Sequence, residues 1–278
     1  MNRWIYSFLL LPFLAAADLT PFALITMPKS GSHMMIKALH LITGSPAIWH
    51  THFPSFWCIP PEHGFLYTHF CLDPQLECNY RALPELRKVI SIRDLRDVAV
   101  SIVSQIKRSP WPGMDSDERA VFLGAPFDEQ LLFVIDYEYD VIEVAAKAPN
   151  SSQASLIRVA EQAALYAADP NNLVCRYEDL VGEMGGGSLE RQLHELRRMA
   201  QFIGAELSEE QVFEIAESLY GNEFDPFGKQ GFEHFHSTFS KGKIGAWRRA
   251  FKEEHKIAFK KKLGKALIEL GYEDDDDW

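Results

Sequence analysis

The sequence lacks an excess of positive charge. It contains 28 lysines and arginines against 39 aspartates and glutamates, so its formal net charge is −11 and its pI is near 5.4. General nucleic-acid binding needs a basic face, and this composition therefore argues against that class of protein. An anionic ligand would have to be held by a local cluster of lysines and arginines, against the field of the whole chain.

Long apolar runs are missing as well. The mostly apolar stretch Trp4–Ala17 is shorter than the about 20 residues of a membrane-spanning helix, and no later stretch is long enough. It follows a positive start at Arg3 and ends in Ala15-Ala16-Ala17. This pattern predicts a cleavable export signal over residues 1–17, with an uncleaved anchor or a packed helix as alternatives. We therefore expect the secretory pathway, with the cytoplasm as the alternative, and membrane contact only through this segment.

Cysteine is scarce, and the metal-binding spacings are absent where cysteine and histidine gather. The loop-rich stretch His50–Cys78 contains no C-x-x-C and no H-x-x-x-H pair. A zinc site is therefore not predicted, and we expect no metal. In an exported chain, a disulfide among Cys58, Cys71 and Cys78 remains open.

The P-loop signature G-x-x-x-x-G-K-[ST] is also absent, but a related arrangement is present. The apolar run Phe22–Met27 predicts a buried strand, and the spacing within Ser32–Thr43 predicts a helix that ends at Gly44. The turn Pro28–Ser32 between them contains one lysine, one glycine and two serines. The first N–H groups of a helix have no intrahelical acceptor, so this turn suits an anion. An ordinary surface turn is the alternative.

A second strand–helix junction follows at residues 87–106. Val89–Ile92 predicts a buried strand and Asp94–Ile106 a helix. Arg93 closes the strand and Ser101 lies two turns into the helix, so both side chains can converge on one phosphate. The alternative is a surface ion pair of Arg93 with a neighbouring aspartate.

These junctions resemble two nucleotide motifs of the sulfotransferase family that uses 3′-phosphoadenosine 5′-phosphosulfate (PAPS). The motif P-K-S-G-[ST] is matched by Pro28–Ser32, and R-x-x-[RK]-D-[VA]-x-x-S is matched by Arg93–Ser101. The sequence Y-E-D-L at Tyr177–Leu180 and the K-G-x-x-G-x-W segment at Lys241–Trp247 extend the resemblance. Ser240 departs from it, because the family has an arginine there.

The resemblance implies a single α/β domain over residues 18–272, with a central parallel sheet flanked by helices in a P-loop-like architecture. An acidic, solvated tail is expected over residues 273–278. Four apolar runs separated by helical segments support the same class independently. They are Phe22–Met27, Phe65–Phe70, Val89–Ile92 and Leu173–Tyr177.

The resemblance also implies transfer of a sulfuryl group from PAPS to a hydroxyl or amine of a small-molecule, carbohydrate or peptide acceptor. Lys29 would stabilise the leaving group, and His69, near the end of an expected strand, would be the general base. Alternative bases are His52, His63, His236 and Glu62. The expected donor-binding residues are Lys29, Ser30, Gly31, Ser32, His33, Arg93, Ser101, Tyr177, Lys241 and Gly242. Tyr177 is equally consistent with a packed aromatic.

Two other functions remain open. A P-loop phosphotransferase would need a magnesium-binding carboxylate after a strand, for which Asp94 and Asp179 are the candidates. A sulfotransferase-like binding module without turnover is the second, because Ser240 replaces the expected arginine.

The rest of the chain gives only secondary-structure expectations. We expect a loop over Lys107–Gly124 and a flexible turn at Gly185–Gly187. Helices are expected over Phe127–Ala148, Ser152–Ala168, Leu189–Gly204, Ser208–Gly221 and Lys252–Leu270.

Overall fold

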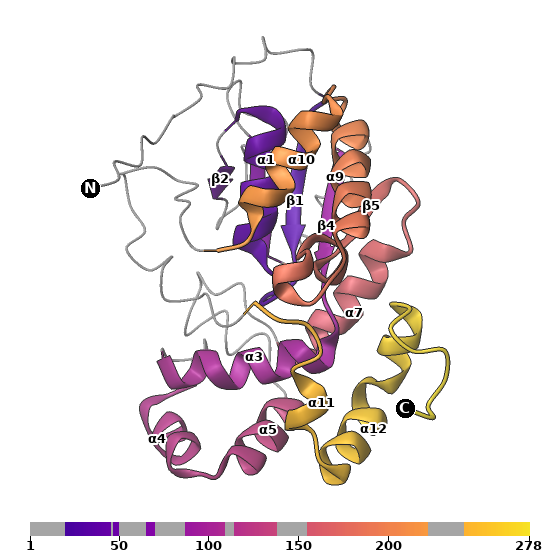
Figure 1. The fold of residues 1–278 in the computed structure, drawn as a ribbon. Helices are drawn as coiled ribbons and strands as arrows, with labels where there is room; N and C mark the ends of the chain where they lie inside the picture. The colour runs from indigo at the N-terminus through magenta and orange to yellow at the C-terminus, as the bar shows by residue number, and fades with distance from the viewer. Residues whose placement is uncertain are drawn as a thin grey trace, which may run out of the picture.

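One parallel sheet forms the centre of the molecule. The computed structural model describes residues 20–45, 47–49, 65–69, 87–108, 114–137, 155–221 and 242–278. In this part of the chain, five parallel strands lie in the order β2-β3-β1-β4-β5 (Figure 1). They are β1 (Phe22–Thr26), β2 (Ala47–Trp49), β3 (Phe65–His69), β4 (Arg87–Ile92) and β5 (Asn172–Arg176). The predicted α/β domain with a parallel sheet flanked by helices is confirmed.

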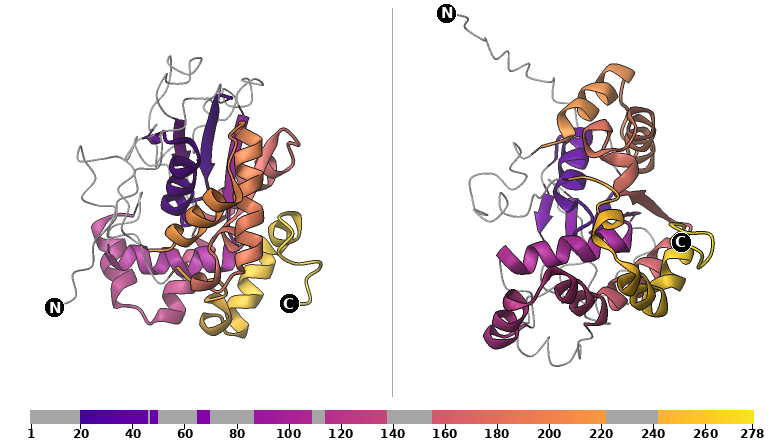
Figure 2. Two further views of the ribbon diagram at one scale, coloured as in Figure 1. Left: turned by 45° about the horizontal axis from the view of Figure 1, so that its top comes forward. Right: turned by 60° about the horizontal axis from the view of Figure 1, so that its bottom comes forward.

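Helices cover both faces of the sheet because successive side chains of a strand point to opposite faces. Ala23 and Ile25 of β1 belong to one buried cluster, whereas Phe22 and Leu24 belong to the other. The first face packs against α3 (Leu95–Arg108), α5 (Phe127–Asp136), α7 (Leu156–Ala167) and α12 (Glu253–Glu269). The second packs against α1 (Ser32–Thr43), α9 (Leu189–Ile203) and α10 (Glu209–Leu219), as Figure 2 shows from two further sides.

Helices with clear start and stop signals lie where the sequence predicts them. Helix α1 has the predicted bounds and ends at Gly44, whose φ of 68° is the left-handed conformation that glycine adopts readily. Helix α10 begins with the predicted capping box, in which Ser208 and Gln211 bond each other's backbone N–H groups.

The predicted loop over Lys107–Gly124 is wrong. Helix α3 continues to Arg108, and α4 (Ser116–Gly124) occupies the second half of the segment. Asp115 and Glu118 form a capping box at the start of α4. That signal is readable in the sequence, but the nearby prolines and glycine favour a loop. The predicted helix over Phe127–Ala148 ends at Asp136, and residues 138–150 lie outside the described part.

Three short elements were not predicted. Strand β2 has three residues, and the helices α8 (Tyr177–Leu180) and α11 (Trp247–Ala250) have four each. Tyr177 therefore begins a helix and does not end a strand. The expected flexible turn at Gly185–Gly187 instead begins in the last residue of the 3-10 helix η1 (Glu183–Gly185) and contacts residues 242–244.

Within the tail that we expect to be solvated, Asp274–Asp277 are exposed, whereas Glu273 and Trp278 are half-buried. Glu273 forms an ion pair with Arg96, and the Trp278 indole packs edge-on against Trp247. At the other end of the chain, the expected export signal over residues 1–17 lies outside the described residues. Among the helices that are described, none has the length and apolar character needed to cross a membrane.

The topology places a switch point between β1 and β4, and we call the region outside the carboxyl ends of these two strands the crevice. These strands are neighbours, yet the helix that follows β1 covers one face of the sheet and the helix that follows β4 covers the other. In open α/β sheets, ligands bind at such a switch point, outside the carboxyl ends of the strands. The loop after β1 and Arg93 after β4 both lie at this edge.

Candidate active site

The turn between β1 and α1 is held to the sheet by two serine hydroxyls. Ser30 Oγ donates to the Met27 carbonyl at 2.7 Å and lies 3.0 Å from Ser91 Oγ on β4. Ser32 Oγ lies 2.8 Å from Thr26 Oγ1. The Ser30 hydroxyl is therefore used within the protein. The tight turn fixes the start of α1 at the sheet edge.

The start of α1 has the features of an anion site. Gly31 is its N-cap and has no side chain to cap the first turn, and that turn contains no acidic residue. The first N–H groups of a helix carry the positive end of its dipole. Together they favour a phosphate or sulfate at this position.

Tyr177 packs directly on this turn. A Cβ atom on Gly31 would lie 2.4 Å from Tyr177 Cδ2, and Gly31 also has a φ of 84°. The Tyr177 hydroxyl donates to the Gly242 carbonyl at 2.6 Å. Burial raises the pKa of Tyr177 to about 12, so the phenol stays neutral and keeps this donor. Tyr177 thus joins the turn to the segment that begins at Gly242.

Gly31→Ala is expected to destabilise the fold by about 2–5 kcal/mol, as the sum of left-handed strain and overpacking against Tyr177. Gly44→Ala is the matched control. Gly44 has a φ of 68°, but a Cβ there meets nothing within 4 Å, so it bears the strain alone, about 1–2 kcal/mol. Urea denaturation measures both values. Equal losses in the two variants would contradict the close approach of Tyr177.

Lys29 lies on the same turn and is half-buried. Its φ is 66°, the only positive φ of a residue other than glycine in the described part of the chain. Lys29 Nζ donates to Gln105 Oε1 of α3 at 3.0 Å. Burial, followed by repulsion from Arg108 and Arg93, lowers the pKa of Lys29 from 10.5 to about 8. An anion bound beside this group would counter both effects.

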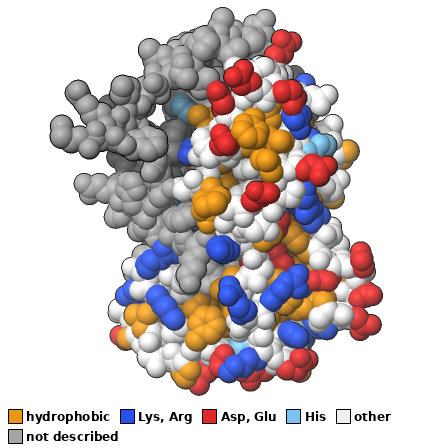
Figure 3. Space-filling view, in the orientation of Figure 1, with side chains coloured by type: hydrophobic (Ala, Val, Ile, Leu, Met, Phe, Trp, Pro, Cys, Tyr) orange, Lys and Arg blue, Asp and Glu red, His pale blue; other side chains and the backbone are white. Residues whose placement is uncertain are grey.

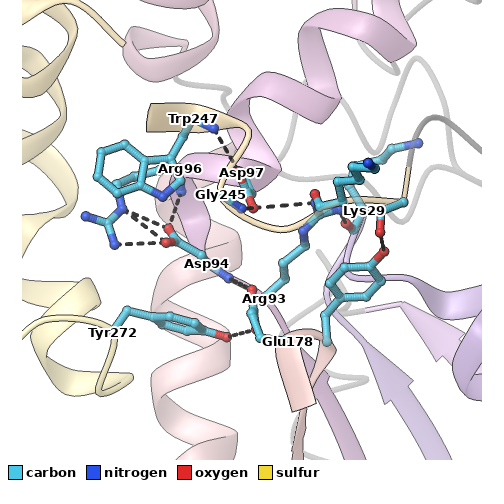
Figure 4. A network of polar contacts seen from close by, with 12 residues as sticks. Lys29, Arg93, Asp94, Arg96, Asp97, Glu178, Gly245, Trp247 and Tyr272 are labelled. Atoms are coloured by element: carbon cyan, nitrogen blue, oxygen red, sulfur yellow. Dashed lines mark hydrogen bonds and ion pairs between the residues drawn. The ribbon is translucent and has the colours of Figure 1, made fainter. Parts of the chain in front are cut away.

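Arg93 bridges the turn and the segment after Gly242. Its guanidinium donates to the Lys29 carbonyl at 3.2 Å and to the Lys243 carbonyl at 3.0 Å. It also lies 4.3 Å from the centre of the Tyr177 ring and 3.6 Å from Asp97. The predicted surface ion pair therefore exists in part, but Arg93 is buried and joins both loops of the crevice (Figure 4).

Asp97 of α3 holds the 242–247 segment through hydrogen bonds to its backbone. Its carboxylate accepts the Gly245 N–H at 2.7 Å and the Trp247 N–H at 2.9 Å. Burial raises the pKa of Asp97, while Arg93 and these two N–H groups oppose the rise. Four parts of the chain thus meet at one edge of the sheet: the turn after β1, the end of β4, Tyr177 and the 242–247 segment.

Positive charge gathers on the surface of this part of the molecule. Figure 3 shows lysines and arginines over the lower half of the molecule as drawn, where Figure 1 places α3, α4 and α11.

This geometry agrees with a comparison to known families. The family model described as the sulfotransferase domain matches residues 19–271, which is most of the chain. The chain belongs to the sulfotransferase family.

Solved structures show the same fold at low sequence identity. A mouse sulfotransferase complexed with PAP, 3′-phosphoadenosine 5′-phosphate, is 16% identical with a TM-score of 0.56, and the match covers 91% of this chain and 87% of that chain. Retinol dehydratase in complex with androsterone and the inactive cofactor PAP is 20% identical, with a TM-score of 0.51 over 89% of this chain and 80% of that chain. The same enzyme with retinol and PAP gives the same identity and score, and 81% coverage of that chain. A sequence search of curated proteins finds no match.

Most predicted donor residues of this sulfotransferase lie together. Those brought to the crevice are Lys29, Ser30, Gly31, Ser32, Arg93, Tyr177 and Gly242. His33 is the second residue of α1, and Ser101 lies within α3. Lys241 and Ser240 lie outside the described residues. The backbone of His69 ends β3 and pairs with Thr26 of β1, so it lies at the same edge.

Four residues around the candidate site were not predicted as site residues. Asp97, Gln105 and Arg108 lie on α3, where the 3.6-residue period could have placed Gln105 one turn after Ser101. Glu178 is the fourth: it accepts the Asp94 N–H and the Tyr272 hydroxyl, each at 3.0 Å, and burial raises its pKa. It fixes the end of β5 against the start of α3.

Carboxylates that would suit a metal are already engaged. Asp94 accepts hydrogen bonds from Arg96 on both oxygens, and Asp179 lies 2.9 Å from Arg191. A cluster of Asp128, Glu254 and His255 lies elsewhere, between α5 and α12. There, both His255 nitrogens already bond backbone groups, and Asp128 pairs with Lys252. In the described part of the chain these groups act in structural contacts.

Proposed function

We propose that this sulfotransferase moves a sulfuryl group from PAPS to a hydroxyl or amine of its acceptor. The observation that carries the proposal is the meeting of the uncapped start of α1, Lys29 and Arg93 at the switch point between β1 and β4. The crystal structures of the mouse sulfotransferase and of retinol dehydratase contain PAP, which supports PAPS as the donor. The turn Pro28–Ser32 would hold the 5′-phosphosulfate, and Arg93, with Lys241 and Gly242, the 3′-phosphate.

The chemistry is an in-line displacement at sulfur. The acceptor oxygen or nitrogen forms a bond to sulfur while the bond from sulfur to the bridging phosphate oxygen breaks, and PAP leaves with that electron pair. Charge then builds on the bridging oxygen, where an ammonium partly shielded from water stabilises it more strongly than it would in water. Lys29 has this role in our proposal. His69 accepts the proton of the acceptor.

The acceptor is proposed to be a small molecule. Androsterone and retinol are present in the two retinol dehydratase structures, and each carries a hydroxyl group. A carbohydrate or peptide acceptor remains the wider class. The segments around the site that would select among acceptors include residues 50–63 and 222–240, which lie outside the described residues.

The first experiment compares donors and then screens acceptors. Calorimetry with PAP should show binding, whereas ATP with Mg²⁺ should not compete, because Asp94 and Asp179 are engaged by arginines. An acceptor panel incubated with PAPS is then read by mass spectrometry for addition of a sulfuryl group. Tight binding of ATP with Mg²⁺ and transfer of phosphate would indicate a phosphotransferase. PAP binding without transfer to any acceptor would favour the binding module.

Arg93→Ala is expected to weaken PAP binding by roughly 1.5–3 kcal/mol, the range of a charge-assisted hydrogen bond. The variant should also discriminate less between PAP and adenosine 5′-monophosphate, which lacks the 3′-phosphate. Calorimetry with both nucleotides measures the difference. Equal weakening of the two would mean that Arg93 supports the loops but does not bind the 3′-phosphate.

PAP affinity is expected to fall as the pH rises above about 8. The pKa of Lys29 is lowered to about 8 in the protein, and a bound phosphate raises it again. Below this pH, Lys29 is charged before and after binding. Above it, binding must take up a proton, so Kd should rise by up to tenfold per pH unit. Calorimetry at about pH 9 in buffers of different ionisation enthalpy measures the uptake.

Lys29→Met is the control for this pH profile, because it has no ammonium to titrate. Its PAP affinity should be weaker near pH 7 and independent of pH in the alkaline range. Identical alkaline profiles for the two proteins would show that another group takes up the proton.

A further inference from the structure

Arg96 connects the donor-binding segment to residues that follow α12. It is 1% exposed, although it carries a full charge. Its Nε and Nη2 atoms donate to the Asp94 carboxylate at 2.8–3.2 Å, and its Nη1 atom pairs with Glu273 Oε1 at 2.5 Å. Both partners are carboxylates, so the buried charge is balanced from two sides.

Two indole rings lie near the same guanidinium. Its Cζ atom lies 3.9 Å from the centre of the Trp247 ring and 4.5 Å from that of Trp278. The two rings also meet each other edge-on at 5.8 Å. Figure 4 shows Arg96 alongside Trp247 and directed toward Asp94. Guanidinium groups bind aromatic rings favourably, and more so where water is excluded. The Trp247 ring is therefore held by Arg96 and Trp278, and its backbone N–H is held by Asp97.

Trp247 in turn belongs to the segment that borders the crevice. Its N–H and that of Gly245 bind Asp97, the Lys243 carbonyl accepts from Arg93, and the Gly242 carbonyl accepts from Tyr177. A continuous series of contacts thus leads from Trp278 and Glu273 through Arg96 and Trp247 to Arg93 and Tyr177. Each link is a direct contact between buried or half-buried groups.

We propose that Glu273 and Trp278 are positioning residues of the donor site: they hold Arg96 in place and so fix residues 242–247 for binding of the nucleotide. The binding of the nucleotide in this inference rests on the proposed function. The positioning of residues 242–247 by Glu273 and Trp278 does not depend on it. Neither residue touches the crevice. Glu273 acts through Arg96, and Trp278 acts both through Arg96 and through its edge-on contact with Trp247.

The test compares Trp278→Ala, Trp278→Phe and Leu263→Ala in the full chain. Leu263 is an aliphatic residue of α12 in the same core, 1% exposed, and its loss lowers stability without removing a ring or charge from Arg96. Hydrogen exchange at the Gly245 and Trp247 N–H groups should be faster in Trp278→Ala and unchanged in Leu263→Ala. Kd for PAP should rise roughly 3- to 30-fold in Trp278→Ala, the range of coupling through contact networks. Trp278→Phe should recover most of both effects.

Glu273→Gln is the second variant, because it removes the charge and keeps the shape if Trp278→Ala fails to fold. In this variant the 242–247 segment should be held less firmly on Asp97. Hydrogen exchange at the Gly245 and Trp247 N–H groups should therefore be faster than in the wild-type chain. Unchanged exchange in both variants would overturn the inference, as would equal effects of Leu263→Ala. If the wild-type chain does not bind PAP, the proposed function fails, and hydrogen exchange still decides the positioning role.

Discussion

Replacing Lys29 by alanine is expected to lower kcat for sulfuryl transfer by about 10²- to 10³-fold, as the loss of one group that stabilises transition-state charge does. The reason is the position of its ammonium: Lys29 is half-buried on the turn that ends at the start of α1, and its carbonyl is bound by Arg93. Without it, the charge that builds on the leaving oxygen would lose a fixed counter-charge.

Stability should not follow activity in this variant. The pKa of Lys29 is lowered from 10.5 to about 8, so below pH 8 its charged form costs folding energy, and this cost disappears between pH 8 and 10.5. Lys29→Ala removes the cost and should keep its melting temperature near pH 7. Lys107→Ala, on the exposed end of α3, is the matched control and should keep kcat. Turnover near the wild-type value in Lys29→Ala would contradict the assignment of Lys29.

His69→Asn is expected to lower the rate by about 10²- to 10⁴-fold, the range for loss of a general base. The structure fixes the backbone of His69 beside Thr26, at the edge where Met27 begins the donor turn. The free imidazole has a pKa of about 6.5 and is mostly neutral at pH 7, so it can take the acceptor proton. The variant should lose the acidic limb of kcat/KM while its PAP affinity stays unchanged.

Variants of the alternative bases His52 and His63 are the controls for His69→Asn. His52→Asn and His63→Asn should keep the acidic limb if His69 is the base. If His69→Asn keeps its rate and its acidic limb, His69 has a structural role and is not the general base. The base would then be one of the alternatives, which include Glu62.

Local signals explain which parts of the fold were predictable. Helix α1 had both an apolar spacing and a glycine stop, and its bounds were correct. The loop expected over Lys107–Gly124 is wrong because Pro110 and Pro112 favour a loop, whereas the capping box at Asp115 starts a helix only three residues later. The four-residue helices α8 and α11 are too short to carry a period of 3.6 residues.

The candidate donor residues can be named from the sequence because they lie in short motifs, but the contacts that hold them cannot. Tyr177 meets a carbonyl 65 residues away, and Asp97 meets an N–H group 148 residues away. No spacing within a motif encodes such pairs. Gln105 and Glu178 were missed for the same reason, since they contact residues of distant segments.

These distant pairs have a consequence for the order of folding. The hydrogen bonds from Gly245 and Trp247 to Asp97 join residues 148 and 150 positions apart, and each closes a long loop of chain. Loop closure costs entropy before the contact repays it, and contacts of long range form slowly. The sheet core around β1 and β4 can form first, but the proposed donor site is complete only when the 242–247 segment docks. Newly made chains would therefore pass through a compact state that has a sheet and no donor site, and PAP added during refolding would bind only after that last closure.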